Sequence, residues 1–201
     1  MGMFRGKAVF GLMATLVLSS LAGASGPASQ AGHQAVQGTK FQFTENIGQW
    51  NFQARFLGRV PGMDIWVTNQ GVVYDLYKLT EVPRQGRVPK PLEKVPNYRR
   101  SGHVIGMNFI GSSANSGAQG SQNLPSKFNY ILNGKVHSGA EAYRETSIQG
   151  LYQGIDARIY FDNGRSRFDL IVKPGADPSQ IQTNFPGAQG VSVSKDNKLV
   201  L

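Results

Sequence analysis

The sequence contains no cysteine among its 201 residues and has only three histidines. Disulfide bonds, thiol catalysis and cysteine-based zinc sites are therefore excluded. The HExxH pattern of zinc hydrolases, the GxSxG pattern of serine hydrolases and the glycine-rich phosphate-binding loops are missing too. We expect no metal or cofactor, and we expect His103 to lie at a strand edge rather than to bind a metal.

Amphipathic helical periodicity is nearly missing as well. The exception is Asp177-Pro178-Ser179, where aspartate can cap a helix and proline can occupy its first position. From Phe41 onward, short segments of alternating apolar residues are separated by glycine, proline and asparagine. This pattern predicts an all-β fold, sandwich-like or built from curved antiparallel sheets with long loops, and at most a short helix near residues 177–183.

Two hairpins are predicted, with turns at Asn69-Gln70-Gly71 and at Asn163-Gly164. Their strands are residues 63–68 with 72–79, and residues 155–162 with 166–173. In the last of these, alternation directs Phe168, Leu170 and Val172 toward the core. Further strands are predicted at residues 54–57, 103–111, 128–132, 191–194 and 199–201.

The first 24 residues resemble a secretory signal peptide. Arg5 and Lys7 precede an apolar run of 15 residues, and Ala22-Gly23-Ala24 forms a small-residue cleavage site, with Ser29-Gln30-Ala31 as a second candidate. The run is shorter than the ~20 residues of a bilayer span. We therefore expect an exported protein, secreted, periplasmic or at the cell surface, without a transmembrane span after cleavage.

The sequence predicts three regions. They are a signal peptide over 1–24, a flexible leader over 25–40 and a single β-rich domain over 41–201. Because residues 199–201 begin an apolar strand that stops at once, we expect the natural chain to continue beyond Leu201.

Two stretches predict long loops. Residues 111–126 are rich in Gly, Ser, Asn and Gln. Residues 82–100 contain four prolines, which donate no backbone hydrogen bond and do not suit a central strand. This second stretch holds most of the net positive charge and suggests a glycan or polyanion site, whereas a solvated loop that aids solubility is the alternative. The candidate contacts are Trp50, Arg84, Arg87, Lys90, Lys94, Arg99 and Arg100.

Aromatic residues refine this hypothesis. Tyr98 is the only aromatic residue in the basic stretch, so the stacking platform of a single-strand nucleic-acid binder is missing, and we expect no specific nucleic acid. Trp50 follows a Gly-Gln pair in a loop and is the better candidate for an exposed sugar platform. Trp66 lies between Ile65 and Val67, and we expect it to pack in the core.

Carboxylates on the C-terminal hairpin offer a third hypothesis. Asp156 and Asp169 fall on one face of that hairpin, and a glycoside hydrolase needs two carboxyl groups about 5 to 9 Å apart. Arg158 and Arg167 lie on the same face, so cross-strand ion pairing explains the carboxylates as well. Asp162-Asn163-Gly164 has too few oxygen ligands for Ca²⁺.

Five phrases resemble one family. They are FTENIGQ at 43–49, GVVYDL at 71–76, NYIL at 129–132, YQGID at 152–156 and FDLIVKPGADP at 168–178. In this order they resemble the N-terminal domain that precedes SBBP-type β-propeller repeats in bacterial exported proteins. The resemblance implies a β-rich module of no assigned activity, with no catalytic residues to carry over and with propeller repeats downstream as its partner.

We therefore expect a non-catalytic structural or interaction module that packs against a downstream β-propeller of the same polypeptide. The alternatives are a module that binds surface polysaccharide or another polyanion, and a secreted hydrolase that uses Asp156 and Asp169.

The leader can be tested directly. When the full chain is produced in a Gram-negative host, the exported protein should begin at Ser25, or at Gly32 if the second site is used, because signal peptidase cleaves after small residues. N-terminal sequencing reads the new end. An exported chain that still begins at Met1 would contradict the assignment.

Overall fold

The computed structural model describes residues 41–82 and 97–201. Strands account for most of these residues, and helix among them is confined to one short 3-10 turn, η2 (Pro178–Gln180). The strands are β1 (Phe43–Glu45), β2 (Ala54–Val60), β3 (Met63–Thr68), β4 (Gly71–Glu81), β5 (Tyr98–Phe109), β6 (Gly117–Leu132), β7 (Lys135–Tyr152), β8 (Ile155–Asp162), β9 (Arg165–Val172), β10 (Thr183–Asn184), β11 (Ser192–Val193) and β12 (Leu199–Val200). The predicted all-β fold is confirmed.

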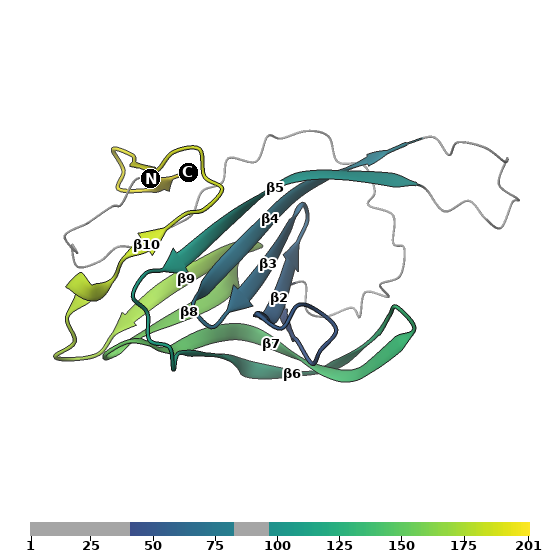
Figure 1. Cartoon of the computed structure of the whole chain (residues 1–201), viewed down its shortest axis with the longest axis horizontal. Helices are drawn as coiled ribbons and strands as arrows, with labels where there is room; N and C mark the ends of the chain where they lie inside the picture. Colours follow the sequence, from purple (N-terminus) through teal and green to yellow (C-terminus); the bar gives the residue numbers. More distant parts are fainter. Residues whose placement is uncertain (1–40, 83–96) are drawn as a thin grey trace, which may run out of the picture.

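Ten strands form one antiparallel sheet. The order is β10-β5-β4-β3-β2-β1-β7-β8-β9, and β6 pairs with β7. The sheet curls strongly, so that β2 to β5 form a front layer, β8 and β9 lie behind it, and β6 and β7 run along the lower side (Figure 1). β11 and β12 form a separate two-stranded sheet.

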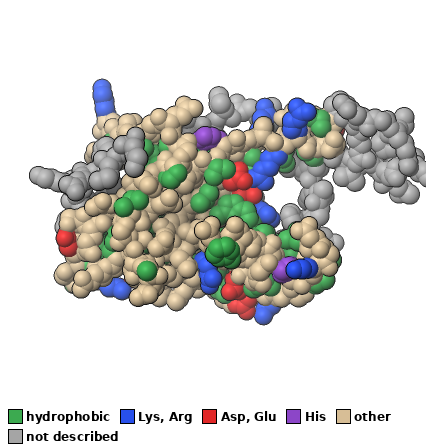
Figure 2. Space-filling model, viewed as in Figure 1, with side chains coloured by type: hydrophobic (Ala, Val, Ile, Leu, Met, Phe, Trp, Pro, Cys, Tyr) green, Lys and Arg blue, Asp and Glu red, His purple; other side chains and the backbone are tan. Residues whose placement is uncertain are grey.

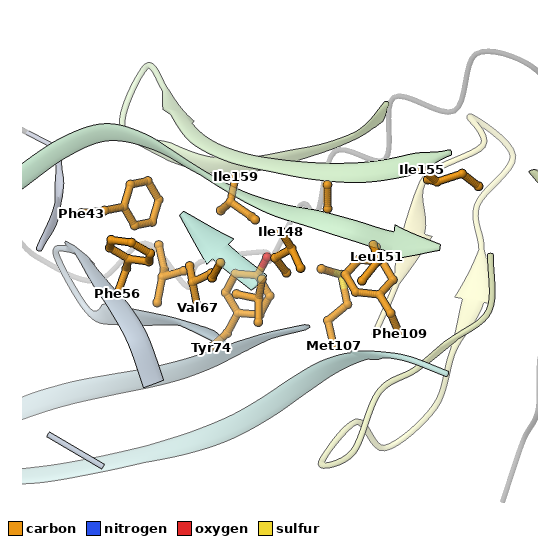
Figure 3. Close-up of a cluster of buried hydrophobic side chains, with 14 of the residues drawn as sticks. Phe43, Phe56, Val67, Tyr74, Met107, Phe109, Ile148, Leu151, Ile155 and Ile159 are labelled. Atoms are coloured by element: carbon orange, nitrogen blue, oxygen red, sulfur yellow. The ribbon is translucent and has the colours of Figure 1, made fainter. Parts of the chain in front are cut away.

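The hydrophobic core lies between the two layers. Val67, Tyr74 and Met107 from the front layer point toward Ile148 and Ile159 from β7 and β8 (Figure 3). All five side chains are buried. Burial also raises the pKa of the Tyr74 phenol to about 12. Most of the apolar surface that drives folding is therefore removed from water where the sheet folds back on itself.

Period-two alternation is confirmed on most strands. Ile105 and Met107 on β5 are buried, as are Ile155 and Ile159 on β8. Val172 is an exception, since it is exposed rather than directed into the core. It is the last residue of β9, which lies at the edge of the sheet among the described strands.

The predicted loop at 111–126 is wrong, because β6 already begins at Gly117. β6 pairs with β7, an 18-residue strand that the sequence pattern did not predict. The register joins Gly117 to Gln149, far along the chain. Among the described strands, β6 pairs with β7 alone, so it lies at an edge of the sheet. Polar side chains suit an edge strand because they discourage pairing with another chain.

The second predicted loop, over 82–100, is shorter than expected. β4 continues to Glu81 and β5 begins at Tyr98, and these two residues are paired in the register. Arg99 and Arg100 are therefore strand residues. Other candidates and regions lie outside the described residues, namely Arg84, Arg87, Lys90, Lys94, the signal peptide and the leader.

Two local predictions are confirmed. Asp177 caps η2, since its carboxylate accepts a hydrogen bond of 2.9 Å from the backbone N–H of Ser179. The turn between β8 and β9 places Asn163 and Gly164 at φ of 49° and 76°, as a tight hairpin turn requires. Within the described part of the chain, no helix is long and apolar enough to cross a bilayer.

Phe43 provides a test of the core. Its ring is fully buried and stacks on Phe161 with centroids 4.6 Å apart. Phe43→Ala should lower the free energy of unfolding by about 3–5 kcal/mol, measured by urea denaturation, because a large cavity remains. Phe52→Ala is the matched control and should change it by less than about 0.5 kcal/mol, since Phe52 is 83% exposed. Equal effects of the two substitutions would contradict the packing.

Candidate functional site

The face of the β2–β5 layer that points away from the core, here called the outer face, carries aromatic and charged side chains. On β3, Ile65 and Val67 are fully buried in the core, so Trp66 between them points to the outer face. The prediction that Trp66 packs in the core is therefore wrong. Asp64 shares the outer face with Trp66 because the two positions are two residues apart.

Three rings form a cluster on the outer face. The centroid of Trp50 lies 5.4 Å from that of Trp66 and 5.2 Å from that of Tyr130, and both contacts are edge-to-face. Such separations are favourable for aromatic pairs. All three side chains are half-buried, so Trp50 is not the freely exposed platform that the sequence suggested.

The loop that carries Trp50 is held by Asn46. The Asn46 side-chain amide donates hydrogen bonds to the carbonyl oxygens of Asn51 and Ala54, at 2.8 and 2.7 Å. Its oxygen accepts from the backbone N–H groups of Gly48 and Trp50. An Asn side chain thereby replaces the backbone partners that an irregular loop lacks, and Trp50 is fixed beside β3.

A network of charges continues the outer face. Arg100 Nη2 lies 2.5 Å from Asp75 Oδ2 and 3.4 Å from Asp64 Oδ2, and Arg59 Nε lies 3.4 Å from Asp64 Oδ1. The Arg100 guanidinium also covers the Tyr77 ring, 3.8 Å from its centroid. Figure 2 shows acidic, basic and hydrophobic side chains gathered in the hollow between the two projecting arms of the molecule.

The network contains an unfavourable pair of carboxylates. Asp64 and Asp75 lie directly opposite each other in the β3–β4 register, and like charges at such positions destabilise a sheet. Arg100 offsets the repulsion because it contacts both carboxylates. Burial raises the pKa of Tyr77, and the negative charge of Asp64 raises it further against the opposing effect of Arg100.

The structure brings together only part of the predicted contact set. Trp50 and Arg100 both lie on the outer face, where Trp50 contacts Trp66 and Arg100 contacts Asp64. Arg99 alternates with Arg100 along β5 and points the other way. The remaining members of the outer-face group, which the sequence analysis missed, are Arg59, Asp64, Asp75, Tyr77 and Tyr130. The sequence did contain a signal for these residues, because Asp64, Asp75 and Tyr77 alternate with apolar residues along their strands.

The carboxylates of the β8–β9 hairpin are ion-paired. Asp156 lies 3.0 Å from Lys173 Nζ and also accepts a 2.8 Å hydrogen bond from the Gly150 N–H. Asp169 lies 3.8 Å from Arg158. These contacts favour the ion-pairing interpretation. Among the described residues, no three His, Asp or Glu side chains are placed to share a metal ion. His103 lies in the middle of β5 and not at the start of a strand, because β5 already begins at Tyr98, and its Nε2 is 2.6 Å from the carbonyl oxygen of Gly187.

A second exposed feature lies at the end of the β6–β7 hairpin. Ile131 and Val136 pair across the hairpin and are 76% and 66% exposed. The loop that carries Trp50 lies against this end, since Trp50 contacts Tyr130 and Gly48 approaches the His137 ring. Tyr130 and His137 are paired with each other, so Ile131 and Val136 face the opposite side of the hairpin, away from the Trp50 loop. We call the exposed apolar surface formed by Ile131 and Val136 the hairpin-tip patch.

The described strands fall within the match to a known family. A family model described as Domain of unknown function (DUF7948) matches residues 43–201, from the first residue of β1 to the last residue of the sequence. The chain belongs to the DUF7948 family. Searches of curated proteins and of solved structures found no match to it. The DUF7948 domain therefore comprises the whole curled sheet together with the β11–β12 hairpin.

Asp156 gives a pH-dependent prediction. Burial raises its pKa, but the Gly150 N–H and the Lys173 ammonium outweigh that effect and hold the pKa below its ordinary value. The carboxylate therefore stabilises the fold fully above its unfolded pKa of about 4, and the contribution is lost as pH falls through the lower folded pKa.

Asp156→Asn should cost about 1 kcal/mol of unfolding free energy at pH 7, and the difference from wild type should shrink below about pH 4. Urea denaturation across pH measures this. Asp196→Asn is the control, because that exposed carboxylate contacts only Lys198 at 3.5 Å. A deficit for Asp156→Asn that stays constant to pH 2 would contradict the assignment.

Proposed function

We propose that this DUF7948 domain is a non-catalytic interaction module of an exported bacterial protein, which packs against another β-rich domain of the same polypeptide. The resemblance stated above makes a downstream β-propeller the partner. The leader over residues 1–24 supports export. The hairpin-tip patch carries the proposal.

The hairpin-tip patch combines apolar exposure with a defined shape. The turn residues Asn133 and Gly134 have φ of 50° and 74°, which is the geometry of a tight hairpin turn. Ile131 and Val136 are held opposite each other just before and after that turn. Exposed apolar residues held side by side are a feature of interaction surfaces, whereas singly scattered ones are ordinary.

Burial of this patch also benefits the domain. The end of the hairpin is a two-stranded ribbon, in which residues 128–132 of β6 pair with residues 135–140 of β7. Among the described strands, no third strand pairs with this part. A two-stranded ribbon is marginally stable in water, so a partner that covers its end stabilises it. A domain that docks on the patch would bury apolar surface and would also stabilise the end of the β6–β7 hairpin.

The ion-paired carboxylates support the non-catalytic part of the proposal. A general acid at neutral pH needs a raised pKa, whereas that of Asp156 is lowered by its partners. Asp169 interacts with Arg158 in the same row of cross-strand pairs. These residues therefore suit a structural role on the β8–β9 hairpin.

Hydrogen exchange tests the proposed interface. The polypeptide that includes the downstream domains should exchange about tenfold more slowly over residues 128–139 than the isolated chain, since burial and ordering suppress local opening. Ile131→Asp combined with Val136→Asp should abolish this added protection. Val104→Asp, at an exposed position on β5, is the matched control and should preserve it. Identical exchange with and without the downstream domains would overturn the proposal.

A further inference from the structure

The outer face contains groups that the proposed interface does not use. Trp66, Asp75 and Tyr77 lie on the neighbouring strands β3 and β4 of the front layer. Trp66 is directly opposite Val73, and Asp75 is the next outward residue after Val73 on β4. Aromatic and polar side chains therefore alternate over a short distance on one surface.

The polar groups of this surface are held in position before any ligand arrives. The Asp64 side chain is only 5% exposed, and it anchors both Arg59 and Arg100. Arg100 is held further by Asp75 and by the Tyr77 ring, yet 44% of its side chain remains exposed. Fixed donors and acceptors that still reach solvent lose little conformational entropy on binding.

The balance of charge limits the kind of ligand. The network contains two arginines and two aspartates, so their formal charges cancel. A polyanion site requires an excess of positive charge. An uncharged ligand that offers both hydroxyl donors and hydroxyl acceptors matches this arrangement, because Asp75 accepts and Arg100 donates within one short contact.

The aromatic residues add a second requirement. The half-buried ring of Trp66 offers apolar surface beside these hydrogen-bonding groups, and the Tyr77 ring holds the Arg100 guanidinium in place. Binding sites for small polar ligands typically combine such apolar surface with a few placed polar groups. Sugar rings meet both requirements, since their C–H faces cover aromatic rings while their hydroxyls remain available at the edge.

We propose that the outer face is a binding site for a neutral oligosaccharide, formed by Trp66, Asp75, Tyr77 and Arg100. Asp64 positions the network from beneath, and Trp50 supports Trp66 from the side. The site is separate from the hairpin-tip patch.

Binding of the exported chain to immobilised dextran, β-1,3-glucan, mannan and alginate tests the proposal. At least one neutral polysaccharide should retain the protein equally in 0.15 M and 1 M NaCl, because neutral ligands are not screened by salt. Trp66→Ala, Arg100→Gln and Asp75→Asn should each weaken retention at least tenfold. Arg99→Gln is the matched control, since it removes the same charge from the adjacent position on the opposite side of β5.

Each outcome is decisive. Loss of retention for Arg100→Gln and Asp75→Asn, with Arg99→Gln unchanged and near-ultraviolet circular dichroism preserved, supports the site even if Trp66→Ala fails to fold. Retention by no neutral polysaccharide overturns it. Salt-sensitive retention on alginate alone, weakened equally by Arg99→Gln and Arg100→Gln, also overturns it in favour of a polyanion surface. The Ile131→Asp and Val136→Asp pair should leave sugar binding unchanged, which separates this test from that of the proposed interface.

Discussion

The pairing of β1 on both of its edges links the two layers of this fold. Phe43 is opposite Gly58 of β2 on one edge and opposite Tyr143 of β7 on the other. A Cβ on Gly58 would lie 2.8 Å from the Phe43 ring and 2.7 Å from the Phe161 ring. The close approach of the two layers at this point therefore depends on a residue without a side chain, as is common where a sheet bends tightly.

That curl also determines what remains outside. Once Ile65 and Val67 face the enclosed core, the alternating residues Asp64 and Trp66 must face away from it. The outer face is thus a direct consequence of core formation. Most of its aromatic and charged residues lie on β2 to β5 themselves. The additions are Tyr130 of β6 and the Trp50 loop, which Asn46 holds in place.

Sequence reasoning succeeded where local pattern and local structure agree. The β8–β9 hairpin was predicted because its turn and its alternation are both encoded within a few residues. It failed for β7 and for the first part of β6, whose polar residues become strands through pairing with each other. It also failed for Trp66, because hydrophobicity was weighed above the alternation that Ile65 and Val67 impose.

The sequence by itself determined the all-β class, the turns of the β3–β4 and β8–β9 hairpins and the apolar faces of the strands that showed clear alternation. Only the tertiary structure decided which residues meet on the outer face. Arg100 reaches Asp64 and Asp75 because β3, β4 and β5 are neighbours, and Trp50, Trp66 and Tyr130 meet because the sheet curls. Turns and alternation arise from the geometry of adjacent residues, so a local pattern can predict them. These contacts arise from backbone pairing between segments that are distant in the chain, and no local pattern specifies that pairing.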